Sequence, residues 1–153
     1  DEIGEEALKA HGGLDKATKS GIIKEFIKEK GYSLINEVYE KEKGFVFDLS
    51  GGSVSSRTFP EASEVVRKNA KKNSIVIGLF PSENIEESIN ILMEREKEGA
   101  HFKEMNHPEL LTKVDKDTRK FPPLFKNFCN IIIYTKGKSP EQIADEVIAF
   151  LQR

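Results

Sequence analysis

The chain has 153 residues, of which 37% are hydrophobic and 8% aromatic, a content that suits one modest core and predicts a single domain over residues 1–153. Its 24 Lys and Arg residues nearly balance 26 Asp and Glu residues, and the net charge of −2 argues against a general nucleic-acid binder, which needs a positive field. One cysteine excludes an internal disulfide, three scattered histidines give no metal-ligand spacing, and no apolar run has the length of a bilayer. We therefore expect a cytoplasmic protein with no metal site held by the chain alone and no membrane partner.

Three helices are predicted before the first strand. In the second of them Ile22, Phe26 and Ile27 recur at helical spacing, and Ser33 would cap the third. The sequence begins with Asp1 rather than Met, which favours a processed product or a part of a longer protein. The three helices are expected over residues 2–10, about 20–30 and 33–43.

Three short apolar runs predict buried strands, and helices separate them along the chain. Strands that alternate with helices pair in parallel through right-handed crossovers. We therefore expect an α/β fold, a three-layer open parallel sheet with helices on both faces. The strands are expected over 45–49, 75–80 and 130–135, and the helices over 60–73, from Ser82 or Asn84 to about 97, and over 141–151 with Ile143, Val147, Ile148 and Leu151 facing inward.

The polar segment 99–123 is the least regular part of the sequence. It contains several prolines and lies between the second and third expected strands. Loops of this length in compact domains are usually lids or disordered excursions, so we expect a lid-like region there.

A glycine pair, Gly51 and Gly52, follows the first expected strand. Ligands of open α/β sheets bind beyond the carboxyl ends of the strands, where residues without side chains let backbone N–H groups approach an anion. We expect a ligand within reach of the backbone of residues 50–53. A tight turn that needs positive φ is the alternative for the glycines, and a loop cap is the alternative for Asp48 near the end of the strand.

The order of these motifs resembles shikimate kinases and their relatives among the P-loop small-metabolite kinases. Ser50-Gly51-Gly52-Ser53-Val54 is similar to the glycine motif that binds the acceptor substrate in that family. Arg95 stands where the family has an arginine that packs against the nucleotide base. His107-Pro108-Glu109-Leu110-Leu111 is similar to the family's lid, and 135–140 to its adenine-contacting loop.

The resemblance implies a P-loop kinase-like fold and transfer of a phosphoryl group from ATP, with Mg²⁺, to a hydroxyl group of a small acceptor. Asp48 would take the catalytic place by ordering the metal's water. The acceptor would be bound by Gly51, Gly52, Ser53, Asn36 and Arg119, and the nucleotide by Arg95, His107, Thr135, Lys138 and Pro140.

The family's phosphate-binding loop, Gly-x-x-x-x-Gly-Lys-Ser/Thr, is absent from this sequence. The nearest string, residues 13–20, has Thr18 where the second glycine belongs. Ile35-Asn36 stands in place of the family's Phe-Arg pair, and Asn cannot supply a fixed cationic fork. His107 stands in place of the lid arginine, and Arg119 is offset from the family's late substrate arginine.

The central strand of the family's sheet, which leads into the phosphate loop, is therefore missing as well. Either the strand over 45–49 pairs directly with the strand over 75–80, or a preceding segment or a partner chain absent from this sequence fills the slot, and we favour the second. Two functions stay open. The chain is part of a small-molecule kinase that is inactive without a P-loop from the parent protein, or it is a noncatalytic module that binds a ligand or a protein.

Overall fold

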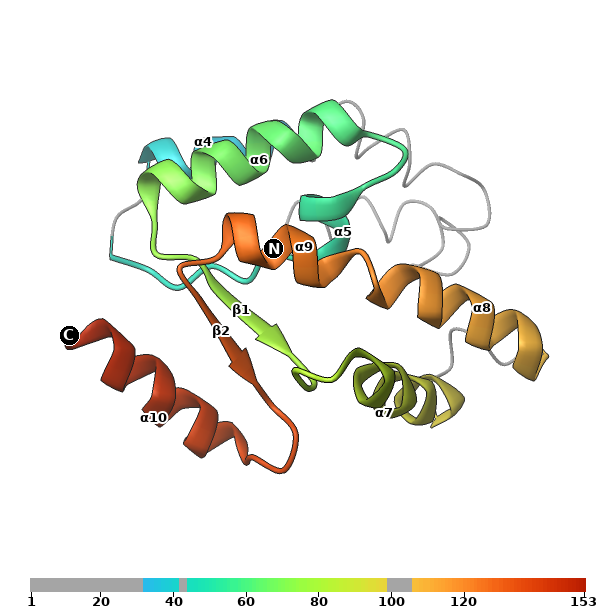
Figure 1. Cartoon of the computed structure of the whole chain (residues 1–153). Helices are drawn as coiled ribbons and strands as arrows, with labels where there is room; N and C mark the ends of the chain where they lie inside the picture. The colour runs from blue at the N-terminus through green and yellow to red at the C-terminus, as the bar shows by residue number, and fades with distance from the viewer. Residues whose placement is uncertain (1–31, 42–43, 99–105) are drawn as a thin grey trace. The chain divides into compact units, whose positions relative to one another are not determined.

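The computed structural model describes residues 32–41, 44–98 and 106–153. The chain divides into two compact units, residues 1–73 and 74–153, and each is described by itself (Figure 1). The helices expected over 2–10 and 20–30 and the string 13–20 lie outside the described residues. The single domain expected over 1–153 stays a prediction.

Unit 1 contains the helices α4 (Tyr32–Lys41), α5 (Gly51–Ser55) and α6 (Pro60–Asn73), and both α4 and α5 pack on α6. The expected helix over 60–73 is confirmed with the same bounds. Pro60 suits its first turn, where no N–H is needed, and Lys71 and Lys72 favour its negative end. Its buried face carries Ser63, Val66 and Ala70, which recur at helical spacing and are fully inaccessible to solvent.

The hydroxyl of Ser63 joins three segments of unit 1. Its Oγ accepts a hydrogen bond from the backbone N–H of Ser56 at 3.0 Å and lies 3.4 Å from the hydroxyl oxygen of Tyr32. The ring of Tyr32 meets that of Phe59 edge to face, with 5.9 Å between centroids. These contacts connect the start of α4 with α6 and with the loop before α6.

The strand expected over 45–49 is wrong. Residues 45–50 follow no regular element, and the side chains of Phe45 and Val46 are 42% and 101% exposed. An apolar run becomes a buried strand only where neighbours cover it. Here the ring of Phe47 instead meets those of Tyr39 and Phe45 edge to face, at 5.9 and 6.2 Å between centroids, so its packing is local.

Unit 2 contains a sheet of two parallel strands, β1 (Ile77–Phe80) and β2 (Ile131–Tyr134), in which Ile77 lies opposite Ile131 and Phe80 opposite Tyr134 (Figure 1). Backbone hydrogen bonds extend the pairing at both ends: Asn130 N–H donates to the carbonyl of Val76 at 2.7 Å, and Thr135 N–H to that of Phe80 at 2.9 Å. The expected parallel pairing of these two runs is confirmed, although both strands are shorter than expected.

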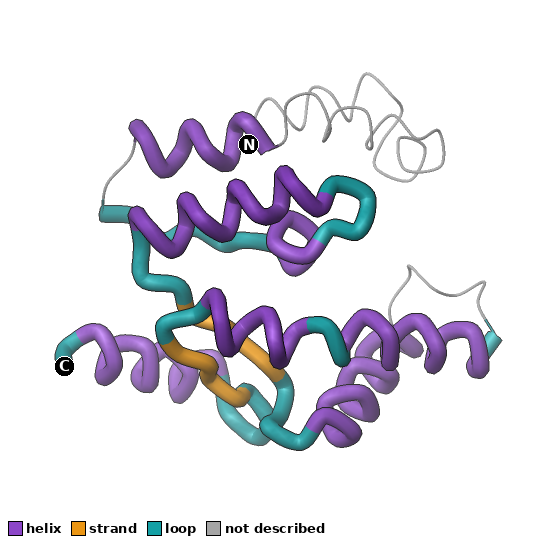
Figure 2. The backbone as a smooth tube through the Cα atoms, turned by 45° about the horizontal axis from the view of Figure 1, so that its top comes forward, coloured by secondary structure: helices purple, strands orange, loops and turns teal. Residues whose placement is uncertain are grey.

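The described residues of unit 2 also form the helices α7 (Ile85–Glu98), α8 (His107–Thr118), α9 (Phe121–Phe128) and α10 (Pro140–Leu151) (Figure 2). The segment 99–123 was expected to be irregular, and this is wrong from residue 107 onward. The side chain of Asn106 accepts from Glu109 N–H at 3.0 Å, and Glu109 reaches back to Asn106 N–H, which starts α8 with a capping box. Ile89 and Met93 of α7 pack with Leu110 and Val114 of α8 in a buried cluster.

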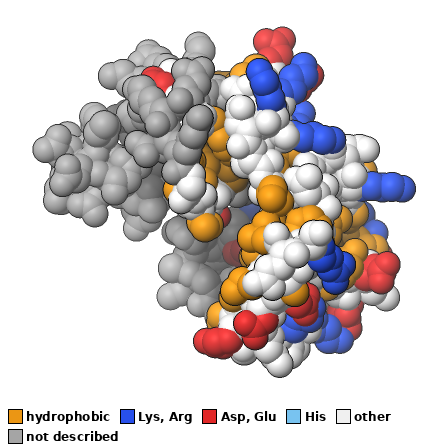
Figure 3. Space-filling model, turned by 90° about the vertical axis from the view of Figure 1, so that its left-hand side faces the viewer, with side chains coloured by type: hydrophobic (Ala, Val, Ile, Leu, Met, Phe, Trp, Pro, Cys, Tyr) orange, Lys and Arg blue, Asp and Glu red, His pale blue; other side chains and the backbone are white. Residues whose placement is uncertain are grey.

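Helix α10 begins at Pro140, one residue before the expected start, and is capped by Ser139, but its packing differs from expectation. None of its residues is buried, and Ile148 and Leu151, expected to face inward, are 50% and 51% exposed. Figure 3 shows one face of the molecule, on which hydrophobic side chains lie at the surface among charged ones. The described residues thus form a mixed, mostly helical fold with one small parallel sheet, and none of their helices is long and apolar enough to cross a membrane.

Candidate functional site

A pocket of about 270 Å³ opens at the carboxyl ends of β1 and β2 in unit 2. The last residue of each strand, Phe80 and Tyr134, lines it, and this edge is where ligands of parallel sheets bind. Helix α9 closes one side with Pro122, Phe125 and Lys126. Ile132 and the loop residues Ser82 and Glu83 complete the lining.

Gly78 sets the distance between β1 and α9. A Cβ atom at this position would lie 2.8 Å from both Cys129 Sγ and Phe125 Cδ2, which is closer than real contacts allow. The missing side chain lets the ring of Phe125 reach that of Phe80, with 6.0 Å between centroids in an edge-to-face pair. Burial in the same contact raises the pKa of the Cys129 thiol to about 11.

Two opposite charges stand at this pocket without ion-pair partners among the described residues. Glu83 follows β1 and Lys126 lies on α9, and both are exposed. Neither forms a salt bridge with the other or with another side chain in 32–41, 44–98 or 106–153. Both charges are therefore available to a ligand.

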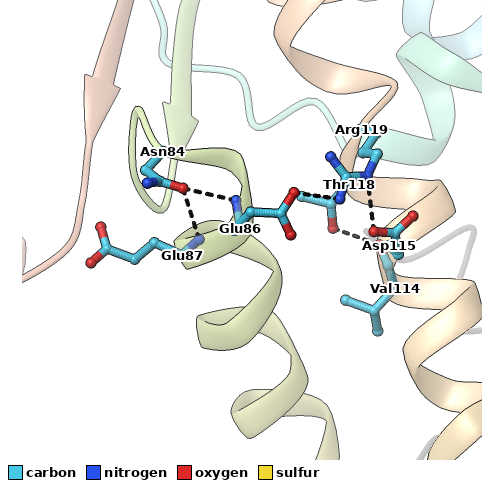
Figure 4. Close-up of polar contacts among 7 residues, drawn as sticks. All are labelled: Asn84, Glu86, Glu87, Val114, Asp115, Thr118 and Arg119. Atoms are coloured by element: carbon cyan, nitrogen blue, oxygen red, sulfur yellow. Dashed lines mark hydrogen bonds and ion pairs between the residues drawn. The ribbon is translucent and has the colours of Figure 1, made fainter.

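The first turn of α7 lies beside the pocket, and side chains next to it in the sequence accept hydrogen bonds from its backbone N–H groups. The side-chain oxygen of Asn84 accepts from Glu86 N–H and Glu87 N–H at 3.0 and 3.2 Å (Figure 4), which confirms Asn84 as a cap. Ser82 N–H donates to Ser88 Oγ at 3.0 Å, and that hydroxyl donates to the carbonyl of Ser82 at 2.8 Å. These bonds fix the loop that lines the pocket and leave fewer free donors for an anion.

The lysines of the 135–140 loop pair with carboxylates of the protein. Lys136 Nζ donates to Glu87, and hydrogen bonds from Lys136 and then Ser82 lower the pKa of that carboxyl group. Lys138 Nζ lies 2.6 Å from Glu146 of α10. Thr135 N–H is bonded to Phe80, and Pro140 is the first residue of α10. A nucleotide phosphate would have to displace these carboxylates to use either lysine.

Arg119 is held in the same manner at the end of α8. Its Nη2 donates to Glu86 of α7 at 2.6 Å and its Nε donates to Asp115 at 2.9 Å (Figure 4). These two carboxylates raise the pKa of the guanidinium, Glu86 more than Asp115. Arg119, which the resemblance places in the acceptor site, thus binds two carboxylates of its own chain.

The glycines and the serine expected to bind the acceptor in unit 1 form the first turn of a short helix. Gly51, Gly52 and Ser53 begin α5, and Ser53 N–H donates to Ser50 Oγ at 3.2 Å. The two glycines do not adopt positive φ, so a turn that requires it is excluded for them. Asp48 is exposed beside them, and Asn36 lies in α4, where only its backbone is described.

The remaining expected nucleotide residues are spread over unit 2. Arg95 lies exposed in the last turn of α7, and His107 lies exposed as the first residue of α8. Of the expected nucleotide residues, Thr135, Lys138 and Pro140 lie near one another, in the loop before α10 and at the first residue of that helix. Among the described residues no group of three His, Cys, Asp or Glu side chains is close enough to hold a metal ion.

The lining residues Phe80, Glu83, Phe125 and Lys126 were not predicted as a site, because α9 was not predicted. Two signals were visible in the sequence. Gly78 interrupts a run of large apolar residues, as a glycine does where another element approaches a strand closely. Phe121, Phe125 and Phe128 recur at helical spacing. Comparisons with family models, with curated proteins and with solved structures find no match for this chain.

Proposed function

We propose that this chain is a noncatalytic module that binds a small organic ligand at the carboxyl edge of β1 and β2. The observation that carries this proposal is the pocket at that edge, which combines three aromatic rings with the charges of Glu83 and Lys126. Ring faces bury apolar ligand surface, at about 25 cal/mol for each Å² removed from water, and a few polar groups fix its orientation. The single cysteine, which cannot form an internal disulfide, favours a cytoplasmic location.

The cations of unit 2 support binding without phosphoryl transfer. Phosphoryl transfer depends on positioned positive charge around the transferring group. Lys136, Lys138 and Arg119 are each held by carboxylates of the chain, and the sequence contains no Gly-x-x-x-x-Gly-Lys-Ser/Thr loop. We propose on this basis that residues 1–153 alone do not transfer a phosphoryl group.

A small-molecule kinase of the shikimate kinase-like group is the second candidate, with ATP and Mg²⁺ as its cofactors. The parallel pairing of β1 with β2, at the places where the resemblance puts two strands of that fold, favours it. The backbone carbonyls of Val76 and Phe80 accept hydrogen bonds from the β2 side. The backbone groups of Ile77 and Leu79 therefore face the opposite edge of the sheet. The side chain of Leu79 is 54% exposed. A further strand at that edge would extend this sheet toward the larger sheet of a P-loop kinase.

One experiment on the full chain separates the two candidates. Backbone NMR spectra recorded with a library of small aromatic compounds should show shifts that gather at residues 80–83, 125–126 and 132–134, and MgATP with shikimate or similar hydroxy acids should give no phosphorylated product. Product formation that is lost in Asp48→Asn would overturn the noncatalytic proposal and favour the kinase. Shifts confined to other parts of unit 2 would overturn the proposed site.

A further inference from the structure

We infer that the ligand of this pocket is an aromatic zwitterion, a compound with one aromatic ring, one ammonium group and one carboxylate, as in a free aromatic amino acid. The inference rests on the proposed function, because it names the ligand class of the same pocket. It follows from the shape of the lining, from its charges and from its rigidity.

The rings of the pocket select a flat apolar group. Phe80 and Phe125 meet at an interplanar angle of 73°, so a third ring can join them in the edge-to-face or offset arrangement that aromatic rings prefer. Tyr134 and Pro122 line the same space. The volume of about 270 Å³ lies below the range of roughly 300–1,000 Å³ that is usual for drug-sized ligands. This space suits a single ring system and disfavours a complete nucleoside triphosphate.

The charges of the pocket select a ligand with both signs. Glu83 would accept hydrogen bonds from an ammonium group, and Lys126 would donate to a carboxylate. The two residues bring no net charge to the lining. A phosphorylated dianion would be attracted by Lys126 but repelled by the negative charge of Glu83. A simple amine would be attracted by Glu83 but repelled by Lys126. Only a zwitterion pairs both groups.

The loop that carries Glu83 is fixed before any ligand arrives. Ser82 and Ser88 are buried and exchange two hydrogen bonds, and Asn84 N–H donates to Ser82 Oγ at 3.1 Å. Little conformational entropy is therefore lost in this loop on binding, which favours affinity for a small ligand.

The test measures the affinity of the full chain for three matched compounds by titration calorimetry and by NMR. L-phenylalanine carries both charges, 3-phenylpropionate only the carboxylate, and 2-phenylethylamine only the ammonium group. We expect L-phenylalanine to bind about tenfold more tightly than either analogue, the effect of one charge-assisted hydrogen bond, with shifts at residues 80–83 and 125–126.

Two charge variants at exposed positions assign the groups. Glu83→Gln should lower the affinity for L-phenylalanine and for 2-phenylethylamine about tenfold and leave the affinity for 3-phenylpropionate unchanged. Lys126→Met should lower the affinity for L-phenylalanine and for 3-phenylpropionate by the same factor. Glu61→Gln and Lys72→Met, exposed on α6 in unit 1, are the matched controls and should change no affinity.

Equal affinity for all three compounds at the pocket, or no response to the two charge variants, would overturn the zwitterion while leaving the proposed binding module in place. If these compounds produce no shifts at the pocket but the wider library does, the inference also fails alone. If no compound of either set perturbs residues 80–83, 125–126 or 132–134, both the inference and the proposed function are overturned.

Discussion

Arg119 and Glu86 join the end of α8 to the first turn of α7, with 2.6 Å between the guanidinium nitrogen and the carboxylate oxygen (Figure 4). Asp115, one turn before Arg119 on α8, holds the same guanidinium at 2.9 Å. The three groups are partly exposed, so solvent and salt screen the attraction between them. The arrangement connects the two helices whose buried side chains Ile89, Met93, Leu110 and Val114 form an apolar cluster in unit 2.

We predict that Arg119→Met lowers the stability of the protein slightly, by less than a core substitution, and that this difference shrinks as salt is added. The reason is the loss of a screened contact between α7 and α8. Urea denaturation at low and high ionic strength measures it, with Arg95→Met, exposed at the other end of α7, as the control. If Arg119→Met leaves stability unchanged but abolishes binding of an acidic ligand, Arg119 serves as the substrate residue that the resemblance implied.

Gly78→Ala should destabilise the protein by about 1–3 kcal/mol, the usual cost of overpacking a tight contact. The added methyl group would lie 2.8 Å from Cys129 and from Phe125. Chemical denaturation measures the change. Gly52→Ala is the control, because its Cβ would meet only Ser50 Oγ, at 3.8 Å, and alanine suits a helix better than glycine. Equal stability of the two variants would show that α9 does not pack closely on β1.

The ion pair of Glu87 with Lys136 should stabilise the protein in a pH-dependent manner. The pKa of Glu87 is lowered in the folded state from its ordinary value of 4.5. The folded protein therefore binds this proton less readily than the unfolded chain, and the stabilisation is present above about pH 5 and is lost as the pH falls through the folded pKa.

Comparison of the wild type with Glu87→Gln by urea denaturation between pH 3 and pH 7 tests this sign. The wild type should be the more stable protein near pH 7, and the two curves should converge toward pH 3. Glu61→Gln serves as the control for loss of one acidic charge. A constant difference across the range would mean that Glu87 acts through packing.

Cys129 should react slowly with iodoacetamide in the folded protein. Its pKa is raised to about 11 from 9.0 by burial, so the thiolate is about a hundred times scarcer near pH 8 than in the unfolded chain. Mass spectrometry of the alkylated protein, with and without urea, gives both rates. Similar rates in the two conditions would mean that the contact of Cys129 with Gly78 opens readily.

The sequence predicted the elements that local signals define. Pro60 and the charged residues at the two ends of its helix predicted the bounds of α6. Asn84 predicted the start of α7. The structure of the apolar run at 45–49 could not be predicted from local signals, because a strand depends on pairing and packing with residues far away in the chain. The side chain of Val46 is not covered by such residues and is fully exposed. Helix α8 was missed although Asn106 and Glu109 form a capping box, since its many charges resembled a loop.

The candidate site was beyond local signals for a similar reason. The carboxyl edge of the sheet was predicted as a place for a ligand, and in unit 2 a pocket lies at that edge, lined by Phe80, Glu83 and Phe125 instead of a glycine motif. Glu83 and Phe125 are 42 residues apart (125 − 83), and only the folded chain shows that both line one pocket. The expected cations were identifiable as charges, but their carboxylate partners, such as Glu146 for Lys138, were not.

Because the hydroxyl of Ser63 is buried, hydrogen exchange at the backbone amide of Ser56 reports local opening of unit 1. Ser56 N–H donates to this hydroxyl, and Ser63 has no exposed surface. The amide hydrogen of Ser56 can exchange with deuterium only when the loop before α6 separates from the helix. The exchange rate of this single amide therefore reports how often the loop leaves α6, at a contact that Tyr32 of α4 also meets.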